Sequence, residues 1–298
     1  MDLNLPAGEL EPSIEEFAAE VGAEGPVTIA GLATRGGPVA GVRTVMAPVG
    51  IVAVQPEEMT VRCGAGTPME ALDAALAAHG QAVAIPPSGT VGGALAVGHS
   101  GIRRLGYGPV RDTVLQVRYV GSTGAVVKAG GATVKNVSGF DLCRLMVGAR
   151  GTLGFLAEVI LRTRPRAPFE QWYVTDREPT DVQRELYRPT SLLWDGSRVW
   201  ALLEGHADDV AAQAAAVGLE PADDPPQLPT GGRWSLPPGE LPRLAGTGRF
   251  VAELGVGIVH HEHPAPERSG DPAIAELHRR IKHEFDPTNR LNPGVRVL

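Results

Sequence analysis

The sequence predicts an α+β protein with a second, smaller lobe, and three observations lead to this prediction. Short runs that alternate apolar and polar residues between turn signals, as at 43 to 66, are typical of strands. Capped segments with apolar residues at helical spacing, as at 67 to 80, are typical of helices. After Pro165 the composition changes and a β, α, β pattern begins, which indicates a separate small lobe.

The first elements follow from caps and turn signals. Residues 12 to 22 predict a short helix, because Ser13 is a candidate N-cap and a glutamate follows it by three residues. A β-branched run at 27 to 30 predicts a strand that ends at a glycine-rich loop. Residues 67 to 80 predict a helix that Thr67 caps, a proline opens and a glycine ends.

The remaining elements of the first half follow a segment rich in glycine. Residues 113 to 131 predict two strands around a Ser-Thr-Gly hairpin signal. Residues 138 to 151 predict a helix that ends at a glycine, and residues 152 to 165 predict a strand.

The second half begins with a strand-like run at 197 to 206 and a helix at 208 to 219. The proline-rich tract at 221 to 242 is expected to be irregular. Residues 248 to 264 predict a strand, and residues 271 to 294 predict a capped helix closed by a proline-containing loop.

These elements predict three parts of the chain. Residues 1 to 165 form the main domain, residues 166 to 248 form the small lobe, and residues 249 to 298 return to the main domain.

Charge and cysteine content exclude several classes of partner. The 298 residues carry a formal net charge of -7, so neither nucleic acid nor anionic lipid is expected as the main partner. The two cysteines, Cys63 and Cys143, form no CxxC pair and predict neither a disulfide framework nor a structural zinc site. Because the N-terminus lacks a signal-peptide pattern and no run reaches the ~20 apolar residues of a spanning helix, we expect a cytoplasmic protein without a membrane span.

Two glycine-rich segments, at 30 to 38 and 87 to 101, could bring backbone N–H groups against an anionic ligand. The first follows a predicted strand but matches neither GxGxxG nor GxxxxGK[ST], which disfavours a nicotinamide-binding Rossmann domain and a P-loop. The alternative interpretation of both segments is a set of tight turns in a crowded α+β fold.

A family resemblance rests on five segments taken in order, namely SGTVGG at 88 to 93, GHSGIRRLGYGPVRDTV at 98 to 114, VKNVSGFDL at 134 to 142, GARGTLGFLAEVILR at 148 to 162 and FDPTNRLNPG at 285 to 294. In this order the chain resembles the FAD-binding flavoproteins of the vanillyl-alcohol oxidase type, which carry a PCMH-type FAD-binding domain. Within this type it is most similar to the flavin-binding subunits of glycolate oxidase. The resemblance implies a two-subdomain FAD-binding domain with a small inserted α+β cap lobe.

The resemblance also implies which residues hold the FAD. The first loop would bind the pyrophosphate through backbone N–H groups, with added charge from the arginine, at Gly31, Leu32, Ala33, Thr34 and Arg35. The ribityl chain, the isoalloxazine ring and the diphosphate would lie along Pro87, Thr90, Val91, Gly92, Gly98, His99, Ser100 and Gly101. The flavin or substrate face would be near Arg103, Arg104 and Tyr107, and the adenine end near Gly151, Gly154, Phe155 and Val159.

The first loop contains no histidine, so the covalent histidyl link of some relatives is not expected there and the resemblance implies non-covalent FAD. This loop has one leading glycine where many relatives have a GGGT-like sequence, a departure that concerns the pyrophosphate site. Lys135 and Asn136 could stabilise an anionic flavin or a substrate carboxylate. Alternatively, Asn136 and Asp141 serve as turn and helix-capping groups.

The histidine-rich run IVHHEHP offers a candidate base. On a strand, His261 and His263 share one face, and His260 and Glu262 share the other. No metal site is expected, because adjacent strand residues do not converge on one ion, although a metal site and a solvated strand end are the alternatives to a base. His260 is the first choice for the base that accepts a hydroxyl proton, and Arg103 for a residue that holds a carboxylate.

The resemblance implies an FAD-dependent oxidoreductase subunit that oxidises a 2-hydroxy acid such as glycolate, with hydride passing to flavin N5 and electrons passing on to a partner. The implied partners are a second flavoprotein subunit and an iron–sulfur subunit, which could also hold the chain at the inner face of the membrane. Two cysteines are too few to bind such a cluster in this chain. The alternatives are a non-catalytic FAD-binding or scaffold subunit, and a cell-wall precursor reductase that would require NADPH.

Overall fold

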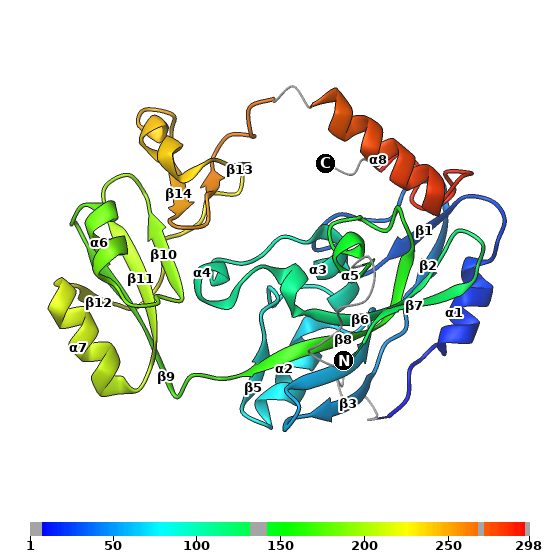
Figure 1. Ribbon diagram of the computed structural model, residues 1–298, viewed down its shortest axis with the longest axis horizontal. Coiled ribbons are helices and arrows are strands. Elements are labelled where there is room, and N and C mark those ends of the chain that lie inside the picture. The colour runs from blue at the N-terminus through cyan, green and yellow to red at the C-terminus, as the bar shows by residue number, and fades with distance from the viewer. Residues whose placement is uncertain (1–7, 132–141, 268–270, 296–298) are drawn as a thin grey trace. The chain divides into compact units, whose positions relative to one another are not determined.

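The computed structural model describes residues 8–131, 142–267 and 271–295, which form two compact units (Figure 1). The first unit comprises the described residues of 1–100, 109–166 and 270–298, and the second comprises 101–108 and those of 167–269. The short segment 101–108 therefore belongs to the second unit although both of its neighbours in sequence belong to the first.

The first unit is built on an antiparallel sheet in the order β3-β4-β8-β6-β7, with β5 paired to β8. The strands are β3 (Ile51–Gln55), β4 (Thr60–Gly64), β5 (Gln81–Val83), β6 (Val114–Val120), β7 (Val126–Gly130) and β8 (Phe155–Pro165). β8 is the longest of them and pairs with β4, β5 and β6, so its side chains are almost all buried. This strand therefore forms the centre of the unit.

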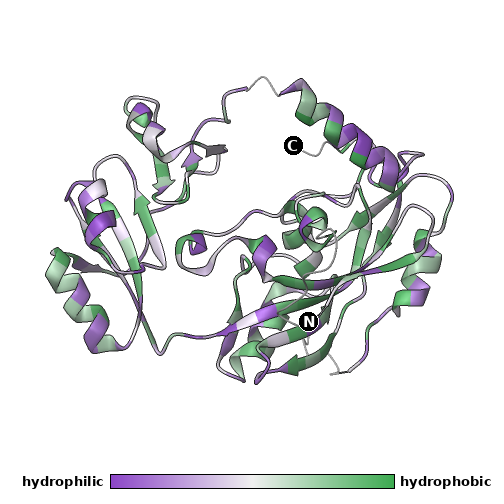
Figure 2. Ribbon diagram, in the orientation of Figure 1, coloured by the Kyte–Doolittle hydropathy of each residue, from purple (hydrophilic) through white to green (hydrophobic). Residues whose placement is uncertain are grey.

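A separate parallel pair, β1 (Val27–Ala30) and β2 (Arg43–Met46), completes the strands of this unit. Its helices are α1 (Ile14–Val21), α2 (Met69–Ala77), α3 (Val91–Val97), the 3-10 turn η1 (Val110–Thr113), α5 (Leu142–Met146) and α8 (Pro272–Phe285). Their apolar side chains, among them Phe17, Leu72 and Leu95, join one buried core with Phe155 and Leu161 of β8. Figure 2 shows α8 as largely hydrophilic, and none of its residues is fully buried.

The sequence predicts side-chain caps for two helices, and the structure confirms one of them. The cap of α1 is confirmed, since the Ser13 hydroxyl accepts from the Glu16 N–H at 3.2 Å and the Glu16 carboxylate accepts from the Ser13 N–H at 2.9 Å. The predicted Thr67 cap of α2 is wrong. Thr67 bonds both backbone groups of Gly50, at 3.1 and 3.0 Å, because this tertiary contact competes successfully for its hydroxyl.

The second unit is one antiparallel sheet in the order β12-β9-β11-β10-β14-β15-β13. The strands are β9 (Phe169–Thr175), β10 (Ser191–Trp194), β11 (Val199–Gly205), β12 (Glu220–Ala222), β13 (Gly232–Ser235), β14 (Phe250–Glu253) and β15 (Ile258–His261). The helices are α4 (Arg104–Tyr107), α6 (Pro179–Glu185), α7 (Ala207–Val217) and the 3-10 segment η2 (Pro238–Leu244). Val182 of α6 and Val210 of α7 pack on one face of this sheet, and Ile102 packs on the other face against Leu193 and Val251.

The chain stays in this second unit beyond residue 249, where we expected a return to the first. The reason is strand pairing, since β14 pairs with β10 and β15 pairs with β13. The proline-rich tract, expected to be irregular, contributes β12 and β13. Both are edge strands of the sheet, where a residue without a backbone N–H is tolerated.

None of the helices in the described part of the chain combines the length and the apolarity needed to cross a lipid bilayer.

His261 is a buried histidine whose proton position follows from its contacts. The ring is fully buried and stacks on Trp234 with centroids 3.9 Å apart. Its Nδ1 accepts from the His263 N–H at 3.0 Å, so Nε2 carries the proton and faces the Thr247 hydroxyl at 3.1 Å. Burial, followed by the charge of His263, lowers the pKa of His261, while Glu262 opposes this effect.

We expect His261 to make the protein less stable in acid. A lowered pKa in the folded state means that the unfolded chain takes up the proton first, so stability present above about pH 6.5 is lost as the pH falls below it. The urea midpoint of the wild type should decrease between about pH 8 and about pH 5.5, and His261→Gln should reduce this decrease. The control is His79→Asn, which removes an exposed histidine of the first unit. An equal pH dependence in wild type and His261→Gln would contradict the assignment.

Candidate functional site

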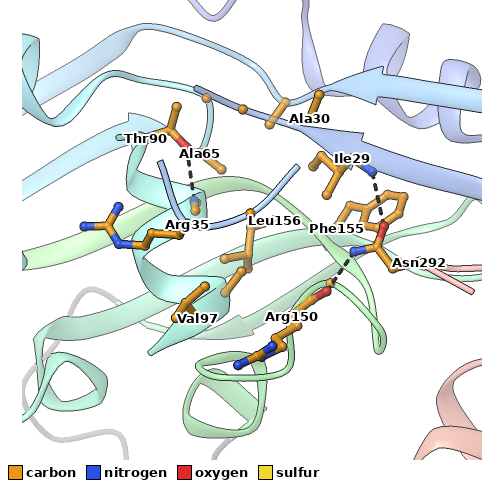
Figure 3. Close-up of a pocket in the computed structure, with 18 of the residues that line it drawn as sticks. Ile29, Ala30, Arg35, Ala65, Thr90, Val97, Arg150, Phe155, Leu156 and Asn292 are labelled. Carbon is orange, nitrogen blue, oxygen red and sulfur yellow. Dashed lines mark hydrogen bonds between the residues drawn. The ribbon is translucent and has the colours of Figure 1, made fainter. Parts of the chain in front are cut away.

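A cavity of about 270 Å³ lies within the first unit (Figure 3). The residues that line it include the loop 31–37 after β1, helix α3 with Thr90 before it, the segment 150–156 that leads into β8, and Asn292 near the C-terminus. Ligand cavities in proteins are commonly about 300 to 1,000 Å³, so this one is slightly smaller than that range.

Glycines allow these segments to approach one another. A Cβ on Gly92 would lie 2.9 Å from both the Cβ and the carbonyl oxygen of Ala65, and one on Gly151 would lie 2.6 Å from Nδ2 of Asn292. By contrast, a Cβ on Gly36 or Gly37 would meet no protein atom within 4 Å. The loop 31–37 therefore presents open backbone at the cavity, which suits close approach of a ligand.

The loop 31–37 is largely exposed, and its leucine, Leu32, leaves 58% of its surface uncovered. Arg35 joins this loop to the second glycine-rich segment, because its guanidinium donates to the Ser88 carbonyl at 2.5 Å and to the Ser88 hydroxyl at 3.1 Å. Burial lowers the pKa of Arg35. The pKa of an arginine is normally so high that the guanidinium nevertheless stays charged. The two glycine-rich segments thus share one positive charge beside the cavity.

Asn292 holds two walls of the cavity together. Its Nδ2 donates to the Arg150 carbonyl at 2.7 Å, and its Oδ1 accepts from the Ile29 N–H at 3.2 Å (Figure 3). The same Oδ1 also accepts from the Thr28 hydroxyl at 2.8 Å. Its own backbone N–H donates to the Val27 carbonyl at 2.9 Å. Sequence reasoning did not single out this residue, although it lies in the segment FDPTNRLNPG that carried part of the resemblance.

The cavity fits the chemistry of FAD. Its walls are apolar at Ile29, Val97, Phe155 and Leu156, which suits flat ring systems. Its glycine-rich loop offers backbone N–H groups to a diphosphate, and Arg35 adds a cation at the same side.

The residues predicted to hold FAD divide into two groups. Those that line the cavity are Gly31, Leu32, Ala33, Thr34, Arg35, Thr90, Gly92, Gly151, Gly154 and Phe155. Those that do not are Pro87, Val91, Gly98, His99, Ser100, Gly101, Arg104, Tyr107 and Val159. Val91 and Val159 are fully buried in the core, and Gly101, Arg104 and Tyr107 belong to the second unit.

Arg103, predicted to hold a substrate carboxylate, is bound by acids of its own unit. Its guanidinium donates to both carboxylate oxygens of Glu170, at 2.7 and 2.9 Å, and to Glu204 at 2.7 Å. The Tyr107 hydroxyl also lies 2.7 Å from Glu204. The hydrogen bonds that Arg103 donates to Glu170 raise the pKa of Arg103 further. These contacts tie the segment 101–108 to β9 and β11.

His260, the predicted base, lies in β15 with its Nε2 2.9 Å from Oε1 of Glu253. The Glu253 side chain is 2% exposed and that of His260 is 18% exposed, so the pair is largely removed from water. Across the described ranges 8–131, 142–267 and 271–295, no group of three or more His, Cys, Asp or Glu side chains is arranged to hold a metal ion. Lys135, Asn136 and Asp141 lie outside the described residues.

Comparison with protein families gives two matches. Residues 26–130 match the FAD binding domain, and residues 244–295 match the C-terminal domain of FAD linked oxidases. The first match covers most of the cavity's loops, and the second covers β14, β15, α8 and Asn292.

Comparison with curated proteins gives relatives that differ in coverage. The glycolate oxidase subunit GlcE of Escherichia coli is 29% identical over 82% of this chain and 84% of its own length. A D-lactate dehydrogenase of Archaeoglobus fulgidus is 38% identical over 35% of this chain, and the chain spans only 24% of that protein. The glycolate oxidase subunit GlcD of Bacillus subtilis is 40% identical over 26% of this chain and 16% of its own length.

Among solved structures, an alkyldihydroxyacetonephosphate synthase superposes with a TM-score of 0.71 over 97% of this chain and 75% of its own. At 13% sequence identity this similarity establishes the fold only.

We expect Gly151→Ala to destabilise the protein more than Gly80→Ala. Both glycines have positive φ, +69° and +63°, so alanine is strained at either position. Only at 151 would the new methyl collide with Asn292, whereas at 80 it meets nothing within 4 Å. Thermal unfolding should show a further loss of about 1 to 3 kcal/mol for Gly151→Ala. Equal losses would mean that the contact with Asn292 adjusts at no cost.

Proposed function

We propose that this chain, which belongs to the FAD-linked oxidases and is an FAD-dependent oxidoreductase, oxidises a 2-hydroxy acid such as glycolate within a complex of several subunits. The observation that carries the proposal is the similarity to GlcE, because it extends along most of both chains. The dehydrogenases that match over shorter stretches are named for D-lactate and D-2-hydroxyglutarate, which are also 2-hydroxy acids.

Bound FAD would supply the acceptor for the two electrons and the hydrogen removed from the substrate. The cavity of the first unit would hold it, with the loop 31–37 and Arg35 at the diphosphate and the apolar walls at the rings. His260 would accept the hydroxyl proton, because a neutral imidazole is a suitable base near neutral pH. Glu253 would orient that imidazole through the contact at 2.9 Å.

The proposed partners are a second flavoprotein subunit and an iron–sulfur subunit, to which the electrons would pass. Within the described residues Cys63 and Cys143 are both buried and form no disulfide, and burial raises the pKa of Cys63 to about 12. Such a thiol is a poor ligand for an iron–sulfur cluster, which needs several thiolates, so the cluster would belong to another chain. Cysteines that form no disulfide within the described residues fit a reducing compartment, and we therefore propose the cytoplasm, with membrane attachment only through partner subunits.

The first test is whether glycolate reduces the bound flavin. We expect the purified chain to show the visible bands of oxidised flavin, to release the flavin on acid precipitation, and to bleach when glycolate is added without oxygen. If the chain binds flavin but none of the 2-hydroxy acids bleaches it, the result would contradict catalysis by this chain and favour a non-catalytic FAD-binding subunit. A chain that binds no FAD would favour a scaffold subunit, and bleaching by NADPH instead of glycolate would favour a reductase.

The second test concerns His260. We expect His260→Gln to slow flavin reduction by glycolate by about 10²- to 10⁴-fold, because the general base is lost, with little change in FAD affinity. Stopped-flow absorbance measures the reduction rate, and fluorescence titration measures the FAD affinity. His206→Asn, at an exposed position in the same unit, is the matched control. An unchanged reduction rate in His260→Gln would exclude His260 as the base.

A further inference from the structure

One face of the second unit's sheet carries four polar residues, Ser191, Arg233, Glu253 and His260. Together with Arg104 of the adjacent helix α4 we call them the polar cluster. Arg233 of β13 lies directly opposite His260 of β15 in the strand register. Glu253 of β14 contacts His260 at 2.9 Å, so these side chains point to the same side of the sheet. This is the side on which Leu193 and Val251 pack with Ile102, as their registers with Glu253 and His260 require.

The short helix α4 lies next to the same strands. The Gly106 N–H donates to the Thr190 carbonyl at 3.1 Å, one residue before β10. Leu105 lies at the turn between β14 and β15, since a Cβ on Gly255 would meet its Cδ1 at 2.9 Å. Arg104, which begins α4, is thereby held beside β10 and β14.

Two buried polar atoms of this cluster lack a hydrogen-bond partner among the described residues. They are Oε2 of Glu253, on a residue 2% exposed, and Oγ of Ser191, on a residue fully buried. In the antiparallel register β10 and β14 are neighbours, with Leu193 opposite Glu253, so Ser191 lies two residues away on the same face. Buried polar groups in folded proteins are nearly always hydrogen-bonded, so a partner from outside the chain is expected.

The two arginines of the cluster also lack a salt bridge among the described residues. Within the described residues neither Arg104 nor Arg233 forms an ion pair, whereas Arg103, Arg177 and Arg184 of the same unit each do. Both side chains are partly buried. Burial and then the nearby charge of Arg104 lower the pKa of Arg233, with Glu253 opposing them. An anion placed between the two guanidinium groups would remove this repulsion.

We propose that Arg104 and Arg233 bind the carboxylate of a 2-hydroxy acid and that its hydroxyl donates to the adjacent His260–Glu253 pair. This inference rests on the proposed function. The ligand carries its carboxylate and hydroxyl on neighbouring carbons, and the sheet places Arg233 and His260 directly opposite each other, where Cβ atoms are about 5 Å apart. Arg103, whose guanidinium is held by Glu170 and Glu204, then acts only as the anchor of the segment that carries Arg104.

Equilibrium dialysis of radiolabelled glycolate against the full chain tests the proposal. The bound flavin is kept reduced in the absence of oxygen, so that glycolate is bound but not oxidised. We expect saturable binding that is weaker for acetate, which lacks the hydroxyl. Arg233→Met and Arg104→Met should each weaken glycolate binding by about tenfold or more, because each removes a charge-assisted pair of hydrogen bonds. Arg233→Lys should restore part of the affinity.

The matched control is Arg184→Met, which removes an arginine of α6 whose side chain is 75% exposed. Thermal unfolding verifies that each variant is folded. Glycolate affinity that is unchanged in both Arg104→Met and Arg233→Met, or equal affinity for glycolate and acetate, would overturn the proposal. Flavin bleaching by glycolate is measured separately, on the same variants with the flavin oxidised. If bleaching persists while the arginines prove irrelevant, only the arginine assignment fails; if glycolate binds through the arginines but does not bleach the flavin, the proposed oxidation fails instead.

Discussion

The guanidinium of Arg290 is the contact on which the first unit depends. Arg290 is 4% exposed, and within the described residues its guanidinium donates to the backbone carbonyls of Val21, Gly22, Glu24, Gly25 and Ser122, at 2.8 to 3.1 Å. Asp286 fixes the same segment by accepting from the backbone N–H groups of Arg290 and Leu291 and from Lys282. Burial alone would raise the pKa of Asp286, but these hydrogen bonds more than offset it and lower the pKa.

By fixing this segment, Arg290 and Asp286 set the position of Asn292, two residues after Arg290. Asn292 in turn positions walls of the cavity. Asn292 joins β1 to the loop that precedes β8, although these strands are in different sheets. Its backbone has φ of 46°, a conformation that asparagine tolerates better than most residues. The cavity is therefore closed by residues from both ends of the chain, and the FAD-binding family match alone, at 26–130, does not contain all of its walls.

Local signals predicted those parts of the protein whose structure depends on nearby residues. The capping box at Ser13 and the glycine-rich loops are such cases, because caps and positive φ angles are set within a few residues. The same approach failed at Thr67, whose hydroxyl bonds Gly50 seventeen positions away. It also gave no role to Asn292 or Arg290, because each residue acts on backbone groups more than 140 positions distant.

By itself the sequence determined the α+β class, the order of the glycine-rich segments and hence the flavin family. Only the tertiary structure decided which charged groups face each other. Arg103 and Arg104 are adjacent and equivalent in the sequence, yet Arg103 meets Glu204, 101 positions away, while Arg104 lies near Arg233. Strand register across the second unit's sheet controls these pairings, and register depends on packing between distant segments that no local pattern encodes.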